Sequence, residues 1–168
     1  KDIRKKKWKR YERMHSLTAV HIDWHYTGMV WVFAVIDDAS RKILSAIECN
    51  SPTTKSSIEC MKMAMKHGKI KQCISDRGSQ FMNNMEGYSE FQEFLKLNLI
   101  KHIKCKIKHP QSNGKIEKWW DCYDSHRKAF KSLGELLKWY NEVRPHRSLN
   151  FEVLETPAQA FERKRRKE

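Results

Sequence analysis

The chain has 168 residues, a net charge of +14 and 39% hydrophobic residues, which suits one domain with a single core. No apolar run approaches the roughly 20 residues that span a bilayer. Five scattered cysteines without a Cys-x-x-Cys pair argue against a disulfide framework and a zinc knuckle, so we expect an intracellular protein, in the cytoplasm or nucleoid if the source is prokaryotic.

Positive charge is concentrated at the two ends of the chain. Residues 1–13 contain eight Lys or Arg against two acidic residues, and residues 161–168 contain five against two. Basic ends of this kind attract phosphate groups without reading sequence. We therefore divide the chain into a basic N-terminal segment (1–14), a core domain (15–163) and a basic C-terminal tail (164–168), and expect contact with nucleic acid.

The first half of the core predicts a three-stranded meander. His15–Trp24 has the pattern of a strand, and Gly28–Asp37 is an apolar run typical of a strand buried on both faces. The turn that joins them, His25-Tyr26-Thr27-Gly28, is short enough for a hairpin. A third strand is expected over Lys42–Cys49.

The rest of the core alternates helices with short strands. Helices are expected at 51–66, 88–97, 112–130, 133–143 and 157–163, and strands at 72–75 and 100–103. An open mixed sheet of five strands with helices packed on it follows from this order, which places the chain in the α/β class.

Two aspartates stand in unusual contexts near strand ends. Asp23 lies in the apolar strand sequence His-Ile-Asp-Trp-His, where a buried carboxylate needs a cation or hydrogen bonds. Asp76 follows the strand at 72–75 and precedes Gly78, at the strand edge where open sheets bind ligands. Each alone could be a turn or capping residue. We interpret Asp37 and Asp38, at the turn into the third strand, as structural.

Glu117 lies about one turn inside the helix expected at 112–130. Asn113, Asp121 and Asp124 fall on its side of that helix, and the core residues Ile116, Trp119 and Tyr123 on the other. A polar loop containing Pro110 and Gly114 precedes it and could follow a nucleic-acid backbone. In isolation, Glu117 would be a solvated helical residue.

The three acidic contexts, in this order, resemble the catalytic core of the retroviral-integrase (DDE) superfamily, and most closely the transposases of prokaryotic insertion sequences, including archaeal ones. Residues 75–81 (Ser-Asp-Arg-Gly-Ser-Gln-Phe) resemble the second-aspartate motif, and residues 109–117 (His-Pro-Gln-Ser-Asn-Gly-Lys-Ile-Glu) the glutamate motif. Residues 37–41 and 140–149, with Thr156-Pro157, resemble two further family signatures. The likeness runs from about Arg10 to Arg163.

The resemblance implies a ribonuclease-H-like fold, a five-stranded mixed sheet with helices on both faces, and an integrase or transposase catalytic core over 15–163. Asp23, Asp76 and Glu117 would be the catalytic residues and would hold two Mg²⁺ or Mn²⁺ ions for DNA 3′-end cleavage and strand transfer. Asn113, Lys115, Lys118, Gln111 and His109 are the candidate DNA contacts. The expected partners are DNA, as element ends and target, and further copies of the chain in a homo-oligomer, with no membrane and no small-molecule substrate.

The sequence departs from the retroviral pattern in three respects. Forty residues separate Asp76 from Glu117, a wider spacing, and we place the extra length at Met82–Glu90. Asp121 and Asp124 occupy positions where retroviral relatives present lysines. No His-His-Cys-Cys zinc module precedes the core, so recognition of DNA ends is expected to lie outside this chain.

Two alternatives stay open on sequence grounds. A ribonuclease H or related nuclease would use Asp23, Glu59, Asp76 and then Asp121 or Asp124. A domesticated DNA-binding protein would keep the fold and the basic ends without chemistry. Trp119, Trp120 and Trp139 could form an interface, although core packing is the more ordinary role of such residues.

Overall fold

The computed structural model describes residues 13–76, 89–104 and 114–166. It contains one five-stranded sheet with the order β3-β2-β1-β4-β5. The strands are β1 (Val20–Tyr26), β2 (Trp31–Asp37), β3 (Ile43–Cys49), β4 (Gln72–Ser75) and β5 (Lys101–Lys104). β1, β2 and β3 form an antiparallel meander, and β4 pairs in parallel with β1 and β5. The predicted five-stranded mixed sheet is confirmed.

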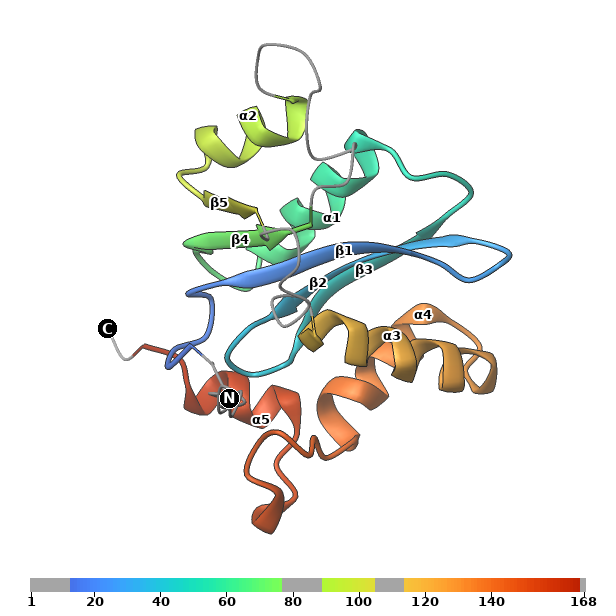
Figure 1. Ribbon diagram of the computed structural model, residues 1–168. Helices are drawn as coiled ribbons and strands as arrows, with labels where there is room; N and C mark the ends of the chain where they lie inside the picture. The colour runs from blue at the N-terminus through green and yellow to red at the C-terminus, as the bar shows by residue number, and fades with distance from the viewer. Residues whose placement is uncertain (1–12, 77–88, 105–113, 167–168) are drawn as a thin grey trace, which may run out of the picture.

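Helices cover both faces of this sheet, as expected (Figure 1). One side carries α1 (Thr54–Met65) and α2 (Glu90–Leu97), and the other carries α3 (Gly114–His126) and α4 (Leu133–Lys138). The last helix of the described residues is α5 (Pro157–Arg163). Side-chain hydroxyls define the starts of several helices: Thr53 caps α1, and Ser89 and Thr156 form capping boxes at α2 and α5.

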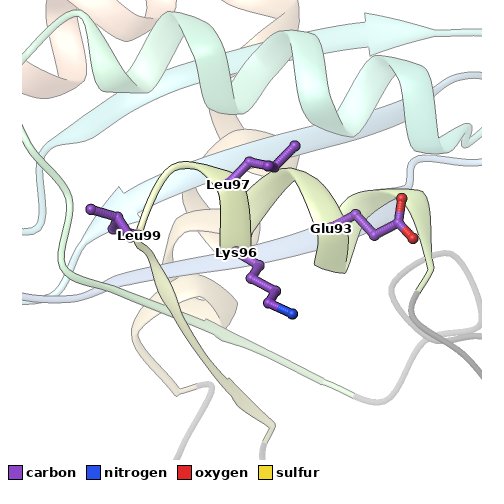
Figure 2. Close-up of a pocket in the computed structure, with 4 residues that line it drawn as sticks. All are labelled: Glu93, Lys96, Leu97 and Leu99. Carbon is purple, nitrogen blue, oxygen red and sulfur yellow. The ribbon is translucent and has the colours of Figure 1, made fainter.

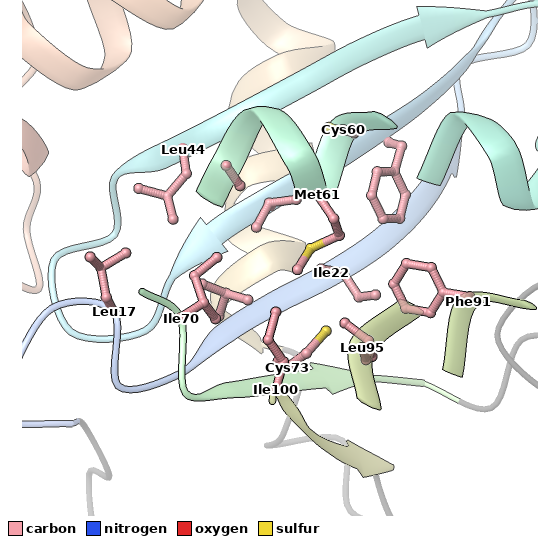
Figure 3. Close-up of a cluster of buried hydrophobic side chains, with 14 of the residues drawn as sticks. Leu17, Ile22, Leu44, Cys60, Met61, Ile70, Cys73, Phe91, Leu95 and Ile100 are labelled. Carbon is pink, nitrogen blue, oxygen red and sulfur yellow. The ribbon is translucent and has the colours of Figure 1, made fainter. Parts of the chain in front are cut away.

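Where a single core was expected, two hydrophobic cores, one on each face of the sheet, result from the alternation of side chains along the strands. The α1 and α2 side is filled by residues that include Ile22, Met61, Cys73, Phe91 and Leu95 (Figure 3). The other core, on the α3 side, contains Ile116, Trp119, Trp120 and Tyr123 together with the β2 residues Val32, Ala34 and Ile36. The prediction that Ile116, Trp119 and Tyr123 point into the core is therefore confirmed.

The predicted limits of β1 and β2 were wrong. We expected strands at His15–Trp24 and Gly28–Asp37, whereas β1 begins at Val20 and β2 at Trp31. Residues 14–18 form bends and turns, with Leu17 at φ 62°. The hairpin closes between Thr27 and Val30, where the Thr27 amide donates to the Val30 carbonyl. Period-two alternation cannot distinguish a strand from the extended segments that flank it.

Other boundaries shifted by one or a few residues. β5 is at Lys101–Lys104 instead of 100–103, and α2 begins at Glu90 instead of Tyr88. The helix expected at 112–130 ends as an α-helix at His126 and continues as a 3₁₀ turn, Arg127–Ala129. The helix expected at 133–143 becomes a π-helical segment, Trp139–Val143, after Lys138. Such boundary changes are common at helix ends.

The π-helical segment places Asn141 against the start of edge strand β3. The Asn141 side chain accepts a hydrogen bond from the Ile43 amide at 2.9 Å and donates to the Ile43 carbonyl at 3.0 Å. Asn141 is buried, so water cannot readily replace these bonds. An asparagine side chain thus takes the place of a neighbouring strand at this point of the sheet edge.

Replacing Asn141 with Ala is expected to lower the free energy of unfolding by about 2–4 kcal/mol, because two buried backbone groups lose their partner. Urea unfolding followed by circular dichroism measures this change. Asn150→Ala is the matched control, since Asn150 is exposed and a surface substitution of this kind changes stability by about 0.5 kcal/mol or less. Equal losses in the two variants would contradict this role for Asn141.

Candidate functional site

The register of the parallel pair β1 and β4 places two of the candidate carboxylates next to each other. Val20 pairs with Cys73 and His21 with Ile74. The same offset, continued beyond these pairs, sets Asp23 opposite Asp76, the residue directly after β4. Neighbouring strands lie about 4.8 Å apart. Val20 and Cys73 both belong to the core on the α1 side, so alternation directs Asp23 and Asp76 toward the other face, which α3 covers.

The electrostatics of Asp23 agree with this placement. Burial raises the pKa of Asp23 to about 6, although the hydrogen bond from Trp120 lowers it, and the negative charge of Asp76 raises it further. The Asp23 carboxylate accepts hydrogen bonds from the Trp120 indole at 3.1 Å and from the Trp24 amide at 2.9 Å. A half-buried carboxylate beside another one is the arrangement that a cation would stabilise.

Glu117, the third candidate, lies in the first turn of α3. Glu117 is exposed, whereas Trp120, almost one turn later on the same helix, contacts Asp23 directly. Within the described ranges, no three His, Cys, Asp or Glu side chains form a group that could hold one metal ion. The structure therefore brings Asp23 and Asp76 together and leaves Glu117 on the adjacent helix without joining it to them.

The donor chemistry of this site suits Mg²⁺ or Mn²⁺. Carboxylate oxygens are the ligands that these hard cations prefer, and Mg²⁺ in particular is commonly held by one or two carboxylates together with water and substrate phosphate. Asp23 and Asp76 supply two carboxylates, and the charge of Asp76 acts on Asp23. The residues present thus fit a divalent-cation site that includes phosphate oxygens.

The first turn of α3 is also connected to the sheet through Asp38. Its carboxylate, 1% exposed, accepts hydrogen bonds from His21 Nε2 at 2.7 Å, Lys115 Nζ at 2.5 Å and the Arg13 amide at 2.8 Å. Asp37, fully buried, accepts from Leu17 and Ser40. These contacts agree with the interpretation of both aspartates as structural, and sequence reasoning did not foresee the link of Asp38 to α3 through Lys115.

The candidate DNA contacts are only partly described. His109, Gln111 and Asn113 lie outside the described residues. Lys115 forms the ion pair with Asp38, and Lys118 is exposed and pairs with Asp121 at 2.8 Å. To contact phosphate, Lys115 would have to give up its bond to Asp38. The solvated ion pair of Lys118 with Asp121 contributes little free energy, so Lys118 can contact phosphate instead.

Two contacts near Asp23 were missed at the sequence level. Trp120 was assigned to the core or an interface, yet its indole N–H reaches the Asp23 carboxylate. His25 stacks on the Trp120 ring, with centroids 4.9 Å apart and planes 15° from parallel. Two signals were available in the sequence: Trp120 lies three residues after Glu117, and His25 lies two residues after Asp23. Neither signal predicts a contact unless α3 is known to pack on β1.

A surface depression on α2 is unrelated to these residues. It is lined by Glu93, Lys96, Leu97 and Leu99 (Figure 2), and α2 packs on the face of the sheet opposite α3. The pair Asp23 and Asp76, with α3 beside it, is therefore the candidate active site.

Of the helices in the described ranges, none is long and apolar enough to cross a membrane.

Comparison with known proteins identifies the family. The model of the integrase core domain family matches residues 14–110. The chain belongs to the integrase core domain family. The matched residues include Asp23 and Asp76 and end before Glu117, and the family resemblance seen in the sequence motifs is confirmed.

Relatives of this integrase core domain include a protein named "Putative integrase ORF3" from Spiroplasma virus SpV1-C74. It is 28% identical over 149 residues, and the match covers 73% of this chain and 40% of that protein. The chain thus corresponds to less than half of the length of this relative.

Solved structures share the fold of this integrase core domain. The simian T-cell lymphotropic virus intasome, in complex with PP2A regulatory subunit B56 gamma, contains a chain that matches with a TM-score of 0.72 and 17% identity, over 90% of this chain and 56% of that one. The catalytic core domain of BIV integrase matches with a TM-score of 0.68 and 15% identity, over 87% and 94%. Because integrase catalytic cores have the ribonuclease-H-like fold, that fold prediction is confirmed.

Asp23→Asn is expected to stabilise the metal-free protein at neutral pH by about 1–3 kcal/mol, because the pKa of Asp23 is raised from 3.8 to about 6 and one pKa unit corresponds to about 1.4 kcal/mol. A raised carboxylate pKa means that ionisation disfavours the folded state. This penalty is absent below pH 3.8, develops between pH 3.8 and 6, and is complete above pH 6.

Thermal unfolding of parent and variant from pH 4 to 8, with a chelator present, measures this effect. The two melting temperatures should converge near pH 4 and separate above pH 6. Glu59→Gln is the control, since it alters an exposed carboxylate on the far helix α1. A difference between Asp23→Asn and parent that does not vary with pH would contradict the expectation.

Proposed function

We propose that this chain is the catalytic core of a DDE transposase or integrase, a polynucleotidyl transferase and endonuclease that cuts DNA at 3′ ends and joins them to target DNA. Asp23, Asp76 and Glu117 are the proposed catalytic and metal-binding residues. The observation that carries the proposal is the parallel pairing of β1 and β4, whose offset directs Asp76, directly after β4, toward Asp23, and the negative charge of Asp76 acts on Asp23, with the Glu117 helix bonded to Asp23 through Trp120. Residues 15–163 form the proposed catalytic core domain.

The proposed reaction assigns a distinct task to each part of the site. Two bound Mg²⁺ or Mn²⁺ ions would activate the attacking oxygen and stabilise the leaving 3′ oxygen of an in-line displacement. Asp23, in β1, and Asp76, directly after β4, would supply two of the carboxylates, and Glu117, in the first turn of α3, would supply the third. Water is the nucleophile in cleavage, and the freed 3′-hydroxyl is the nucleophile in joining.

DNA is the proposed partner, both as element ends and as target. The net charge of +14 supports attraction to the phosphate backbone, and the side chain of Lys118, beside Glu117, is 76% exposed and accessible for a phosphate contact. Joining two ends requires two active sites, so we propose a homo-oligomer. Because the chain spans 40% of its viral relative, sequence-specific recognition of the ends is assigned to segments outside this chain.

Metal-dependent cleavage and joining of labelled DNA tests this proposal. The chain, and longer forms that contain it, would be incubated with linear and branched duplex DNA and with RNA–DNA hybrid, in Mn²⁺, Mg²⁺ or EDTA. We expect cleavage and joining of DNA in either metal and none in EDTA. Preferential cutting of the hybrid would favour a ribonuclease H, and DNA binding without cleavage in any form would favour a non-catalytic DNA-binding protein.

A further inference from the structure

Two adjacent tryptophans of α3 differ in the use of their indole N–H groups. Trp119 and Trp120 are both buried, at 0% and 6% exposure. Within the described residues, Trp119 Nε1 has no hydrogen-bond partner, whereas Trp120 Nε1 donates to Asp23 Oδ2 at 3.1 Å. Hydrophobic packing alone explains why Trp119 is buried. It does not explain why the indole N–H of Trp120 donates to Asp23, a proposed metal ligand.

The Trp120 ring is itself fixed by a second contact between α3 and β1. His25 stacks on it at a centroid distance of 4.9 Å, and His25 Nε2 lies 2.9 Å from both carboxylate oxygens of Asp124. Trp120 and Asp124 are four residues apart on the helix, which corresponds to a rise of about 6 Å. Their partners Asp23 and His25 are two residues apart on the strand, about 6.6 Å. The two spacings match, so one alignment of α3 with β1 allows both contacts to form.

We propose that Trp120 is a positioning residue for Asp23, held in place by the His25 and Asp124 pair; this role rests on the proposed function of the Asp23 site. The indole N–H orients the Asp23 carboxylate and sets the distance between β1 and the helix that carries Glu117. Each carboxylate oxygen can accept more than one bond, so Asp23 can receive this bond and still bind a cation. Partners that orient a metal ligand typically change metal affinity by about 10–100-fold when they are removed.

Trp120→Phe tests this role, with Trp119→Phe as its matched control. Each substitution replaces an indole with a smaller ring at adjacent buried positions of one helix, but only the first removes the bond to Asp23. Calorimetric titration with Mn²⁺ in the absence of DNA is expected to show about tenfold weaker binding for Trp120→Phe and less than a twofold change for Trp119→Phe. Equal effects of the two variants, or no effect of Trp120→Phe, would overturn the proposal.

A second measurement keeps Trp120 intact, and so decides the matter even if Trp120→Phe does not fold. The indole N–H resonances of assigned Trp119 and Trp120 are followed by NMR in the parent chain and in Asp23→Ala. Loss of the carboxylate acceptor should shift the Trp120 resonance upfield and leave that of Trp119 nearly unchanged. A Trp120 resonance that does not respond would refute the bond.

The outcome is distinguishable from failure of the proposed function. If DNA is cleaved normally by Trp120→Phe and its Mn²⁺ affinity equals that of the parent, the positioning role fails and the enzymatic role stands. If the Mn²⁺ titration and the Trp120 resonance behave as expected but no form of the protein cleaves DNA, the positioning of Asp23 stands and the enzymatic role fails.

Discussion

Asp23→Asn, Asp76→Asn and Glu117→Gln are each expected to reduce metal-dependent DNA cleavage and joining by about a thousandfold or more. Each replaces a carboxylate with an amide of nearly the same shape, so the fold should persist while an anionic ligand is lost. Metal ions contribute several kcal/mol to stabilising the transition state of such displacements, and about 1.4 kcal/mol corresponds to a factor of ten in rate. Initial rates of product formation on end-labelled DNA measure the effect.

Glu59→Gln is the control for this series and should keep its rate within about twofold of the parent. Glu59 is exposed on α1, and α1 packs on the face of the sheet opposite to α3. Far-UV circular dichroism would establish that each variant is folded. The opposite pattern, with Glu117→Gln active and Glu59→Gln inactive, would reassign the site to a ribonuclease-H-type nuclease.

Replacing Asp38 with Ala is expected to lower the free energy of unfolding by about 3–5 kcal/mol. The buried carboxylate has hydrogen bonds from His21, Lys115 and the Arg13 amide, and removing one partner of a buried ion pair leaves the other charge without compensation. Lys115 is only 17% exposed at its side chain, so water cannot fully replace the carboxylate. Urea unfolding at pH 7 measures the loss.

Asp121→Ala is the matched control for Asp38→Ala. Asp121 also pairs with a lysine of α3, but its side chain is 66% exposed and that of Lys118 is 76% exposed. Solvated pairs of this kind contribute about 0–1 kcal/mol. If the two variants lose similar stability, the Asp38 cluster does not anchor α3.

The same cluster should appear in the pH dependence of stability. Burial tends to raise the pKa of Asp38, but the hydrogen bond from His21 and the charge of Lys115 outweigh it and hold that pKa well below its usual range. A lowered carboxylate pKa stabilises the fold above the unfolded value of 3.8, and this contribution is lost as pH falls below 3.8 toward the folded value. Asp38→Ala should lack that part of the acid dependence.

Segments with strong end signals were predicted best from the sequence. β4 at 72–75 and α5 at 157–163 have the predicted limits, since an apolar run ends at Asp76 in one and Thr156-Pro157 starts the other. The start of β1 was missed because Leu17 and its neighbours form a turn that no periodic pattern announces. The π-helical segment after Lys138 was missed because its five residues are too few for a different spacing of apolar residues to show in the sequence.

The candidate site was also predicted only in part from the sequence. The identities of Asp23, Asp76 and Glu117 as candidates came from motif order, while the contact geometry depends on long-range pairing. The Asp23 and Asp76 register requires knowing that β1 and β4 are parallel neighbours at an offset that no local signal encodes. The contacts of Trp120 with Asp23 and of Lys115 with Asp38 were not predicted, because the partners lie 97 and 77 residues apart in the chain. Such contacts follow from tertiary packing and not from local propensity.

The paired contacts between α3 and β1 also limit where this domain can change length during evolution. One residue inserted between Trp120 and Asp124 would rotate the later part of the helix by about 100° and turn Asp124 away from His25. An insertion before residue 114 would leave both contacts in phase, because the helix would keep its alignment from Lys115 onward. Length differences among relatives should therefore accumulate ahead of α3 and be rare within it.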